Sequence, residues 1–535
     1  MKTLVVLFVV YVLRLWRKAL ELDYGTMKLL FLPHMEAVRW NIGKMKALAV
    51  FWMARRQAPA YQQFLRDHHT RSPRLHGLIP DLSSLPIMDK ENYVKRYSLG
   101  ERCLGGKVPG HGIIIDESSG SSGVPTNWVR GTAERRANKR MLEFGLFHLI
   151  GPGPYFLINA FALGPWATGI NITMSFADLA VMKSLGPDAQ KIINTLHSFG
   201  PDQHYVIMGY PPFLKQLVDA APLDWRSYNV TMIYGGEGMS EAMRDYLLAK
   251  GIRKVYGSFG ASDLELNISS ENDFTIALRK AVLSRPELAA RLVKYPGATP
   301  VIFQFNPADF YLEETAAGEL LVTLCRPYYL APKIRYNIHD RGQVIRFSEL
   351  KRILADCGLT PDDIAPGYSE LPLLLHYGRA DMTVAFYGSK IAPADLQEAL
   401  MSTPALASRV QSFTMFTSED EAANKSLRIC MELAQGQSIA DLDAESASPA
   451  FFEELQRINQ DFRESWRMLP VGQRPELTFY SFQTGPFADS DMRIKQQYIH
   501  SEPLSAVPAK AISPRRATTR LVARPSTRRF NLFDL

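Results

Sequence analysis

The sequence predicts an α/β fold, with a large N-terminal domain on a core of parallel strands and a smaller C-terminal α+β domain. The chain has 535 residues, 46% hydrophobic and 21% charged, a composition that excludes disordered, collagen-like and coiled-coil proteins. A chain of this length divides into two or more domains, because single cores stop growing near ~250–300 residues. Short apolar strands run into glycine-rich loops and alternate with helices, which is typical of a parallel sheet with ligand-binding loops at its strand ends.

Cysteine spacing and the position of the charge exclude several classes of protein. The four cysteines are far apart and form no Cys-x-x-Cys pair, which excludes a disulfide framework and a cysteine zinc site and favours a cytoplasmic protein. Of the net charge of +7, the segment 501–535 carries +5, from seven basic and two acidic residues. The remaining +2 excludes a nucleic-acid-binding core. This tail is rich in Ser, Thr, Pro and Ala, so we predict that it is disordered, with loose contact to an anionic membrane as the alternative.

The first 40 residues form an apolar extension. Thr3 to Leu13 is almost wholly apolar, but Arg14, Arg17 and Lys18 end the run, well short of the ~20 residues that a spanning helix needs. No small-x-small cleavage site follows it, as a secretory signal would require. We therefore predict a helix that rests on the protein or on a membrane surface.

The large domain is predicted over residues 41–380. Helices are expected between Trp40 and His69, followed by a strand at 112–115 and a second strand at 230–233. Ser240 is the predicted N-cap of a helix from Glu241 to Lys250. A third strand begins at Val255 and runs into another glycine-rich loop.

The character of the sequence changes toward the C-terminus. Segments 319–324 and 343–347 are predicted antiparallel strands around a loop at 336–340. A strand at 383–387, a turn and a helix that starts near Pro393 follow. We place the domain boundary near Asp381, which gives a second domain over 381–500, and predict a polar linker at 438–449 within it.

A loop rich in hydroxyls and glycine follows the strand at 112–115. It contains Ser118, Ser119, Gly120, Ser121, Ser122 and Gly123. Such a loop can wrap phosphate oxygens with backbone amides and hydroxyls, although it lacks the Gly-Lys-Ser/Thr of a Walker A loop. A flexible surface linker is the alternative. The order of the elements that follow favours the phosphate-binding function.

That order resembles the adenylate-forming superfamily of acyl-CoA synthetases, and within it the phenylacetate-CoA ligase-like branch, which also holds capsule-locus ligases and synthetases that adenylylate a deazaflavin cofactor. Ser118 to Pro125 resembles the ATP phosphate loop of the family. The similarity spans roughly residues 50 to 500 and implies the adenylate-forming fold, with a mobile C-terminal domain.

The resemblance also implies roles for single residues. Gly235, Gly236 and Glu237 resemble the segment that lines the adenine and acyl pocket. In Phe259, Gly260, Ser262 and Asp263, the ring would pack on adenine, the hydroxyl would meet phosphate, and the acid would hold magnesium. Asp340 resembles the ribose-binding aspartate, Arg379 belongs to the hinge motif, and Asp381 is the hinge itself. A structural ion pair is the alternative for Asp340 and Arg379, and a turn or cap for Asp263.

Some positions depart from the family pattern. The metal acid is Asp263 in place of Glu, so Glu265 remains a rival ligand. His339 stands where the family has glycine, and we expect it to have no chemical role. The C-terminal Gly-Lys motif is absent, and Lys495 is the candidate for its lysine, with Arg493 second.

The resemblance implies a ligase that uses ATP, Mg²⁺ and coenzyme A to activate a small aromatic or acyl carboxylic acid. The alternatives are an adenylyltransferase without a thiol step, a non-catalytic binding protein, and a peripheral membrane protein that acts through its N-terminal run or basic tail.

Overall fold

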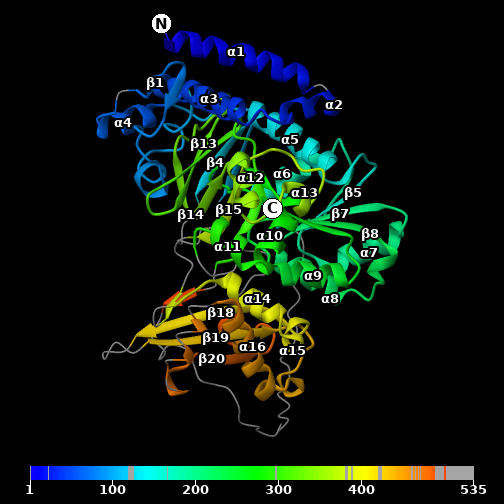
Figure 1. Cartoon of the computed structure of the whole chain (residues 1–535). Coiled ribbons are helices and arrows are strands. Elements are labelled where there is room, and N and C mark those ends of the chain that lie inside the picture. Colours follow the sequence, from blue (N-terminus) through cyan, green and yellow to red (C-terminus); the bar gives the residue numbers. More distant parts are fainter. Residues whose placement is uncertain are drawn as a thin grey trace, which may run out of the picture.

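The computed structural model confirms a mixed α/β architecture (Figure 1). It describes residues 2–21, 23–70, 72–117, 126–164, 167–295, 298–379, 384–386, 389–419, 425–459, 462–463, 466–467, 469, 471–488 and 499–501.

The N-terminal segment is helical, as the sequence predicts. Its elements are α1 (Lys2–Leu20), α2 (Tyr24–Met27), η1 (Lys28–Phe31), α3 (Glu36–Gln57) and α4 (Pro59–Asp67). Helix α1 lies along the outside of the molecule and packs on α3 (Figure 1). In the part of the chain that the structure describes, no helix is both long and apolar enough to cross a membrane.

Two hairpins lead from these helices into the main sheet. The elements are β1 (Arg74–His76), β2 (Ile79–Asp81), the single-turn π-helix η2 (Lys90–Val94), β3 (Ile113–Glu117), β4 (Asn127–Gly131) and α5 (Thr132–Ile150). Strands β3 and β4 pair antiparallel from Ile113 opposite Gly131 to Glu117 opposite Asn127. The predicted phosphate loop connects these two strands in sequence and lies outside the described residues.

Parallel strands form one half of an eleven-stranded sheet, with the order β6-β5-β7-β8-β9. The elements are β5 (Phe156–Asn159), α6 (Ala167–Phe176), β6 (Val181–Ser184), α7 (Ala189–Phe199), β7 (His204–Gly209), α8 (Pro211–Ala220), η3 (Trp225–Ser227), β8 (Asn229–Tyr234), α9 (Glu241–Ala249) and β9 (Lys254–Phe259). The predicted cap is confirmed, since the Ser240 hydroxyl accepts a hydrogen bond from the Met243 N–H at 3.1 Å.

Antiparallel strands complete the sheet, in the order β9-β10-β11-β15-β14-β13-β12. The elements are β10 (Ser269–Ser270), α10 (Asp273–Ser284), α11 (Pro286–Leu292), β11 (Val301–Gln304), β12 (Phe310–Glu314), β13 (Glu319–Leu324), β14 (Tyr336–Ile345), α12 (Phe347–Asp356), α13 (Pro361–Ile364) and β15 (Leu373–Arg379).

The predicted loop at 336–340 is wrong, because these residues form the first half of β14. Tyr336 and Asn337 pair with Val322 and Leu321 of β13, and the register then shifts before Glu319 pairs with Arg341. The polar residues that look like a turn in sequence are held in a strand by neighbours on both sides. Phe347 begins helix α12 and does not end the strand.

The C-terminal unit has its own four-stranded sheet, in the order β20-β19-β18-β21. Its elements are β16 (Val384–Phe386), β17 (Ser389–Ile391), α14 (Pro393–Met401), α15 (Pro404–Ala407), β18 (Val410–Glu419), β19 (Lys425–Leu433), η4 (Ile439–Asp441), α16 (Ala444–Ile458), η5 (Val471–Gln473), β20 (Glu476–Tyr480), η6 (Gly485–Phe487) and β21 (Ile499–Ser501). The linker predicted at 438–449 is wrong, since Asp443 caps α16 by accepting a hydrogen bond from the Ser446 N–H. The segment has the composition of a linker but contains the start of α16.

This unit packs on helices α8 and α9 of the main sheet (Figure 1). The Ser240 N–H donates to the Gln397 side chain at 3.0 Å, and Lys215 donates to the Val410 carbonyl at 3.3 Å. The domain limit near Asp381 stays a prediction, because residues 380–383 are outside the described part of the chain.

Candidate functional site

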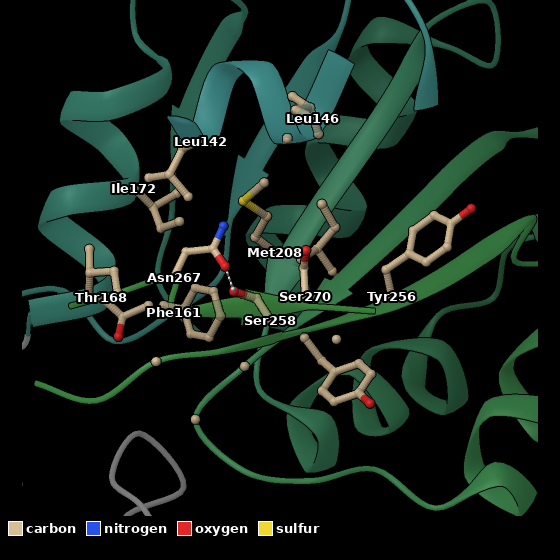
Figure 2. Close-up of a pocket in the computed structure, with 18 of the residues that line it drawn as sticks. Leu142, Leu146, Phe161, Thr168, Ile172, Met208, Tyr256, Ser258, Asn267 and Ser270 are labelled. Atoms are coloured by element: carbon tan, nitrogen blue, oxygen red, sulfur yellow. Dashed lines mark hydrogen bonds between the residues drawn. The ribbon is translucent and has the colours of Figure 1, made fainter. Parts of the chain in front are cut away.

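A cavity with a volume of about 100 Å³ lies where the parallel strands β7, β8 and β9 end against helices α5 and α6 (Figure 2). Loops and side chains at the carboxyl ends of such strands are where ligands bind in open α/β sheets. One wall is apolar and is formed by Leu142, Leu146, Leu149, Phe161, Ile172, Phe176 and Met208. The rest of the lining combines glycines, Ile233, Tyr234, Tyr256 and Leu266 with small polar side chains, among which Ser258 donates a hydrogen bond to Asn267 at 3.4 Å (Figure 2).

Four of the residues predicted from the sequence line this cavity together. They are Gly235, Gly236, Gly260 and Ser262. Gly236 has a φ of 87°, which favours glycine. At Gly260, a Cβ would lie 2.1 Å from the Leu266 carbonyl oxygen, so the loop can fold this tightly only with glycine there. The two glycine motifs thus meet at one site although they are far apart in the sequence.

Asp263 sits on the loop between β9 and β10 and is partly exposed. Its carboxylate accepts a hydrogen bond from the Tyr336 hydroxyl at 2.8 Å. Burial, and then the charge of Asp263, raises the pKa of Tyr336 well above its usual value, so this phenol stays a donor. Tyr336 therefore fixes one carboxylate oxygen of Asp263.

Glu265, the rival acid, is buried, with an exposed fraction of 3%. It accepts a short hydrogen bond from the Tyr329 hydroxyl and another from the Leu266 N–H at 3.1 Å. Its carboxylate is thus used inside the protein, which leaves Asp263 as the acid on the accessible side of this loop.

A buried arginine ties the β3–β4 hairpin to the same loop. Arg130 donates to the Leu264 carbonyl at 2.6 Å, to the Ser262 carbonyl, and to the Asp116 carboxylate at 3.1 Å. Asp116 also accepts from the Asn171 amide at 3.2 Å. The hairpin that carries the predicted phosphate loop is therefore fastened directly to the acid loop. The only sequence signal for this role was a basic residue inside an otherwise half-buried strand.

A buried lysine, Lys333, lies beside Tyr336, the hydrogen-bond partner of Asp263. The Lys333 ammonium group is 4.7 Å from the centre of the Trp128 ring and 5.7 Å from that of Tyr336. Burial, followed by the charges of Arg102 and Arg130, lowers the pKa of Lys333 to about 7. No motif in the sequence marks this lysine.

Asp340 lies on β14 and faces the neighbouring strand β15. It accepts a hydrogen bond from the Nε2 of His376 at 2.9 Å, and the His376 ring lies 4.5 Å from that of Phe259. The predicted adenine-stacking and ribose-binding residues are therefore joined through a histidine that sequence reasoning missed. The Phe259 ring is 9% exposed and also packs on Phe303, 5.9 Å away.

The remaining predicted residues border this group in sequence or strand register, or lie outside the described residues. Glu237 follows the lining glycines but does not line the cavity. Arg379 stands opposite Asp340 in the strand register, and His339 contacts Glu319 at 3.2 Å. The phosphate loop 118–123, the hinge residue Asp381, and the candidates Lys495 and Arg493 lie outside the described residues.

The Asp263 carboxylate is suited to serve as a ligand of a magnesium ion. Among the described residues, no group of three or more His, Cys, Asp or Glu side chains could hold a metal ion. Mg²⁺ beside a nucleotide needs only one or two carboxylates, because phosphate oxygens and water supply its other ligands. Asp263, with one oxygen held by Tyr336, meets that requirement.

Comparisons with known proteins show the fold. No family profile and no curated protein sequence matches the chain. Among solved structures, 2-hydroxyisobutyryl-CoA ligase in the postadenylation state with R3-HIB-AMP has 14% identity and a TM-score of 0.63, over 88% of this chain and 91% of that one. Its complex with 2-HIB-AMP gives 14% identity and a TM-score of 0.62, over 86% and 89%. The open conformation with 2-HIB-AMP and CoA gives 14% and 0.50, over 86% and 90%.

These matches confirm the predicted fold class. Over most of its length, the chain has the mixed α/β fold of adenylate-forming acyl-CoA ligases. The phenylacetate-CoA ligase-like branch stays a prediction.

Proposed function

We propose that this protein activates a small carboxylic acid as its adenylate, with release of pyrophosphate from ATP, and then transfers the acyl group to coenzyme A. The observation that carries this proposal is the meeting of Gly235, Gly236 and the Asp263 loop at one apolar cavity, on a fold shared with ligases that were solved with acyl-adenylates.

The apolar lining of the cavity favours a substrate acid with an apolar body. Its walls carry Leu142, Leu146, Ile172 and Met208, and its polar side chains include Ser258, Asn267 and Ser270 (Figure 2). Apolar side chains favour burial of an aryl or short acyl group. The carboxylate of such a substrate would then point toward Ser262 and Asp263.

The first half-reaction joins the substrate carboxylate to the AMP moiety of ATP. The substrate carboxylate attacks the α-phosphorus of ATP, the bond between the α-phosphorus and the bridging oxygen breaks, and pyrophosphate leaves. A bound Mg²⁺ neutralises the triphosphate charge. In this chain, Asp263 would hold that ion, the loop 118–123 would wrap the phosphates, and Arg130 would keep the two loops in register.

The nucleoside would be held at the other end of the site. Asp340 would accept hydrogen bonds from the ribose hydroxyls, and His376 would orient its carboxylate. Phe259 and Glu237 would form the adenine side. These assignments extend the family resemblance to the positions that match it.

The second half-reaction belongs to the C-terminal unit. The resemblance places Lys495 at the reacting oxygens during adenylation, and a rotation about Arg379 and Asp381 would then admit the thiol. A variant Lys495→Ala should lose adenylation, because a charge aimed at a developing oxyanion stabilises the transition state by several kcal/mol. It should still convert a synthetic acyl-adenylate and coenzyme A to the thioester. Equal loss of both half-reactions would contradict this assignment.

Pyrophosphate release with a panel of carboxylic acids tests the proposed function. We expect release that needs ATP, Mg²⁺ and an acid with an apolar body, and that falls to background in Asp263→Asn. The exposed Asp202 offers the matched control Asp202→Asn, which should keep full activity. Thioester formed only with coenzyme A supports the ligase, whereas product without a thiol supports an adenylyltransferase. No release with any acid would contradict both activities.

A further inference from the structure

Helix α1 presents an apolar face to solvent. Its two-faced pattern follows the helical period, since Leu4, Phe8, Tyr11 and Leu15 recur at spacings of three and four residues. Leu4 is 70% exposed and Phe8 is 66% exposed, although both are large apolar side chains. Val5, Val12 and Trp16 widen this stripe. We call these seven residues the outer face of α1.

The opposite face of the helix is fixed to the protein. Val6, Val10 and Leu20 are buried, and Arg17 forms an ion pair with Asp309. Burial alone would raise the pKa of Asp309, but Arg17, Lys46 and Arg326 around it hold that pKa well below its usual value, so the pair stays charged. A buried pair of this kind is costly to break. The outer face therefore belongs to a rigidly mounted helix, which cannot turn over to hide it.

The charges on α1 are all of one sign. Lys2, Arg14 and Lys18 are exposed, and the helix contains no Asp or Glu. Tyr11 and Trp16 are 58% and 52% exposed. Such amphipathic rings are favoured where an apolar interior meets water. An apolar stripe with flanking cations and aromatic rings is the pattern of a helix that lies in a membrane interface.

We propose that the outer face of α1 docks this protein onto the surface of an anionic membrane. The helix has 19 residues, about 28 Å in length, and would lie in the plane of the interface, because it is fastened to the protein along one side. The exposed Leu29 and Leu32 lie in and just after η1, beyond the short helix α2. The segment 501–535 adds a charge of +5 of the same sign.

A second copy of the chain fits this face less well than a lipid surface. Pairing two α1 helices would bring two sets of cations to one contact, and neither helix has a carboxylate to neutralise them. Like charges across a contact disfavour association. Anionic headgroups supply the missing negative charge, while the acyl region accepts the apolar stripe.

The segment that follows α1, formed by α2 and η1, contacts the helix that forms one wall of the cavity. Phe31 stacks on Phe144 of α5 at 5.3 Å, and Tyr24 stacks on Phe147 at 5.6 Å. Leu142 and Leu146 of the same helix line the cavity. If the site acts as proposed above, α2 and η1 would connect the docked helix to the helix that forms an apolar wall of the cavity.

Co-sedimentation of the full chain with vesicles tests the docking surface. The vesicles contain phosphatidylcholine alone or phosphatidylcholine with phosphatidylglycerol, and the variant is Phe8→Asp with Leu15→Asp. The control, Val181→Asp with Val471→Asp, adds the same charge at residues that are 57% and 79% exposed elsewhere. Circular dichroism verifies that both variants fold.

We expect the unaltered chain and the control to sediment with anionic vesicles, and the α1 variant to lose more than about tenfold in its partition coefficient. Lys2→Gln with Lys18→Gln should weaken binding and its dependence on salt. Three results would overturn the proposal. They are no binding by the unaltered chain, equal binding by the α1 variant (which would place binding in the tail), and a dimer that the α1 variant dissociates without any vesicle binding.

Discussion

Removing the Asp340 carboxylate should weaken ATP binding. Asp340 is 14% exposed in its side chain and is already oriented by the His376 Nε2 at 2.9 Å. Two hydroxyls of a ribose could share its remaining lone pairs, and both would donate to a charged acceptor. The variant Asp340→Ala deletes that acceptor without adding bulk.

The expected magnitude follows from the type of bond. A hydrogen bond to a charged group contributes about 1.5–3 kcal/mol, which corresponds to a rise of about 10- to 150-fold in the dissociation constant of ATP. His376→Ala should have a smaller effect, because it removes only the group that orients the carboxylate. Phe259, which packs on the same histidine, should be little disturbed.

Isothermal titration with ATP and a non-hydrolysable analogue measures this change. Asp340→Asn keeps the shape of the side chain and isolates its charge, and Asp356→Ala removes an equivalent charge from an exposed position. Unchanged ATP affinity in Asp340→Ala, with an intact thermal unfolding midpoint, would refute the ribose assignment. Equal loss in Asp356→Ala would instead indicate a general effect of net charge.

Three more predictions concern the acid loop and the two domain cores. Asp263→Ala should abolish pyrophosphate release at an unchanged unfolding midpoint, whereas Glu265→Ala should cost about 3 kcal/mol or more of stability in chemical unfolding, because it leaves buried partners uncompensated. Glu271→Ala should cost about 3–5 kcal/mol, since Arg244 is 1% exposed and loses a carboxylate 2.7 Å away; replacing both residues by Met should restore most of it. Burial raises the pKa of Asp395 to about 6, so the free energy of unfolding of the C-terminal unit should fall by about 2 kcal/mol as the pH rises from 4 to 6, and Asp395→Asn should flatten that profile.

Each of these has a contradicting result. Loss of pyrophosphate release in Glu265→Ala at full stability, with an active Asp263→Ala, would shift the metal acid by two residues. A double Met variant as unstable as Glu271→Ala would assign the loss to packing and not to the carboxylate that Arg244 loses, since Arg244 keeps Glu241 as a partner at 3.0 Å. A pH profile that Asp395→Asn leaves unchanged would place the titrating group elsewhere.

The sequence predicted those parts of the fold that local signals determine. Apolar strands that end in glycine gave β8 and β9, and Ser240 gave the start of α9 because its hydroxyl caps the helix within three residues. Polar residues led to a wrong prediction of a loop where neighbouring strands determine the secondary structure. Residues 336–340 form the first half of β14, which pairs with β13 on one side and with β15 on the other.

The part of the candidate site that could be predicted from the sequence is the part where only glycine fits. Gly260 has no room for a side chain, and such positions are visible as motifs. Arg130, Lys333 and His376 carry no motif, because each acquires its role from groups far away in the sequence. For Arg130 and His376 the only available sign was a single polar residue in a largely apolar strand, and Lys333 lies in the loop before β14.

A mass spectrum of the protein after incubation with ATP, Mg²⁺ and a mixture of carboxylic acids tests the central claim most directly. We expect an acyl-adenylate of one apolar acid, retained by the unaltered chain when coenzyme A is absent and lost when it is added. Asp263→Ala should show none. The absence of any adenylate from the unaltered chain, or its equal formation by Asp263→Ala, would contradict the assignment of this site to acid activation.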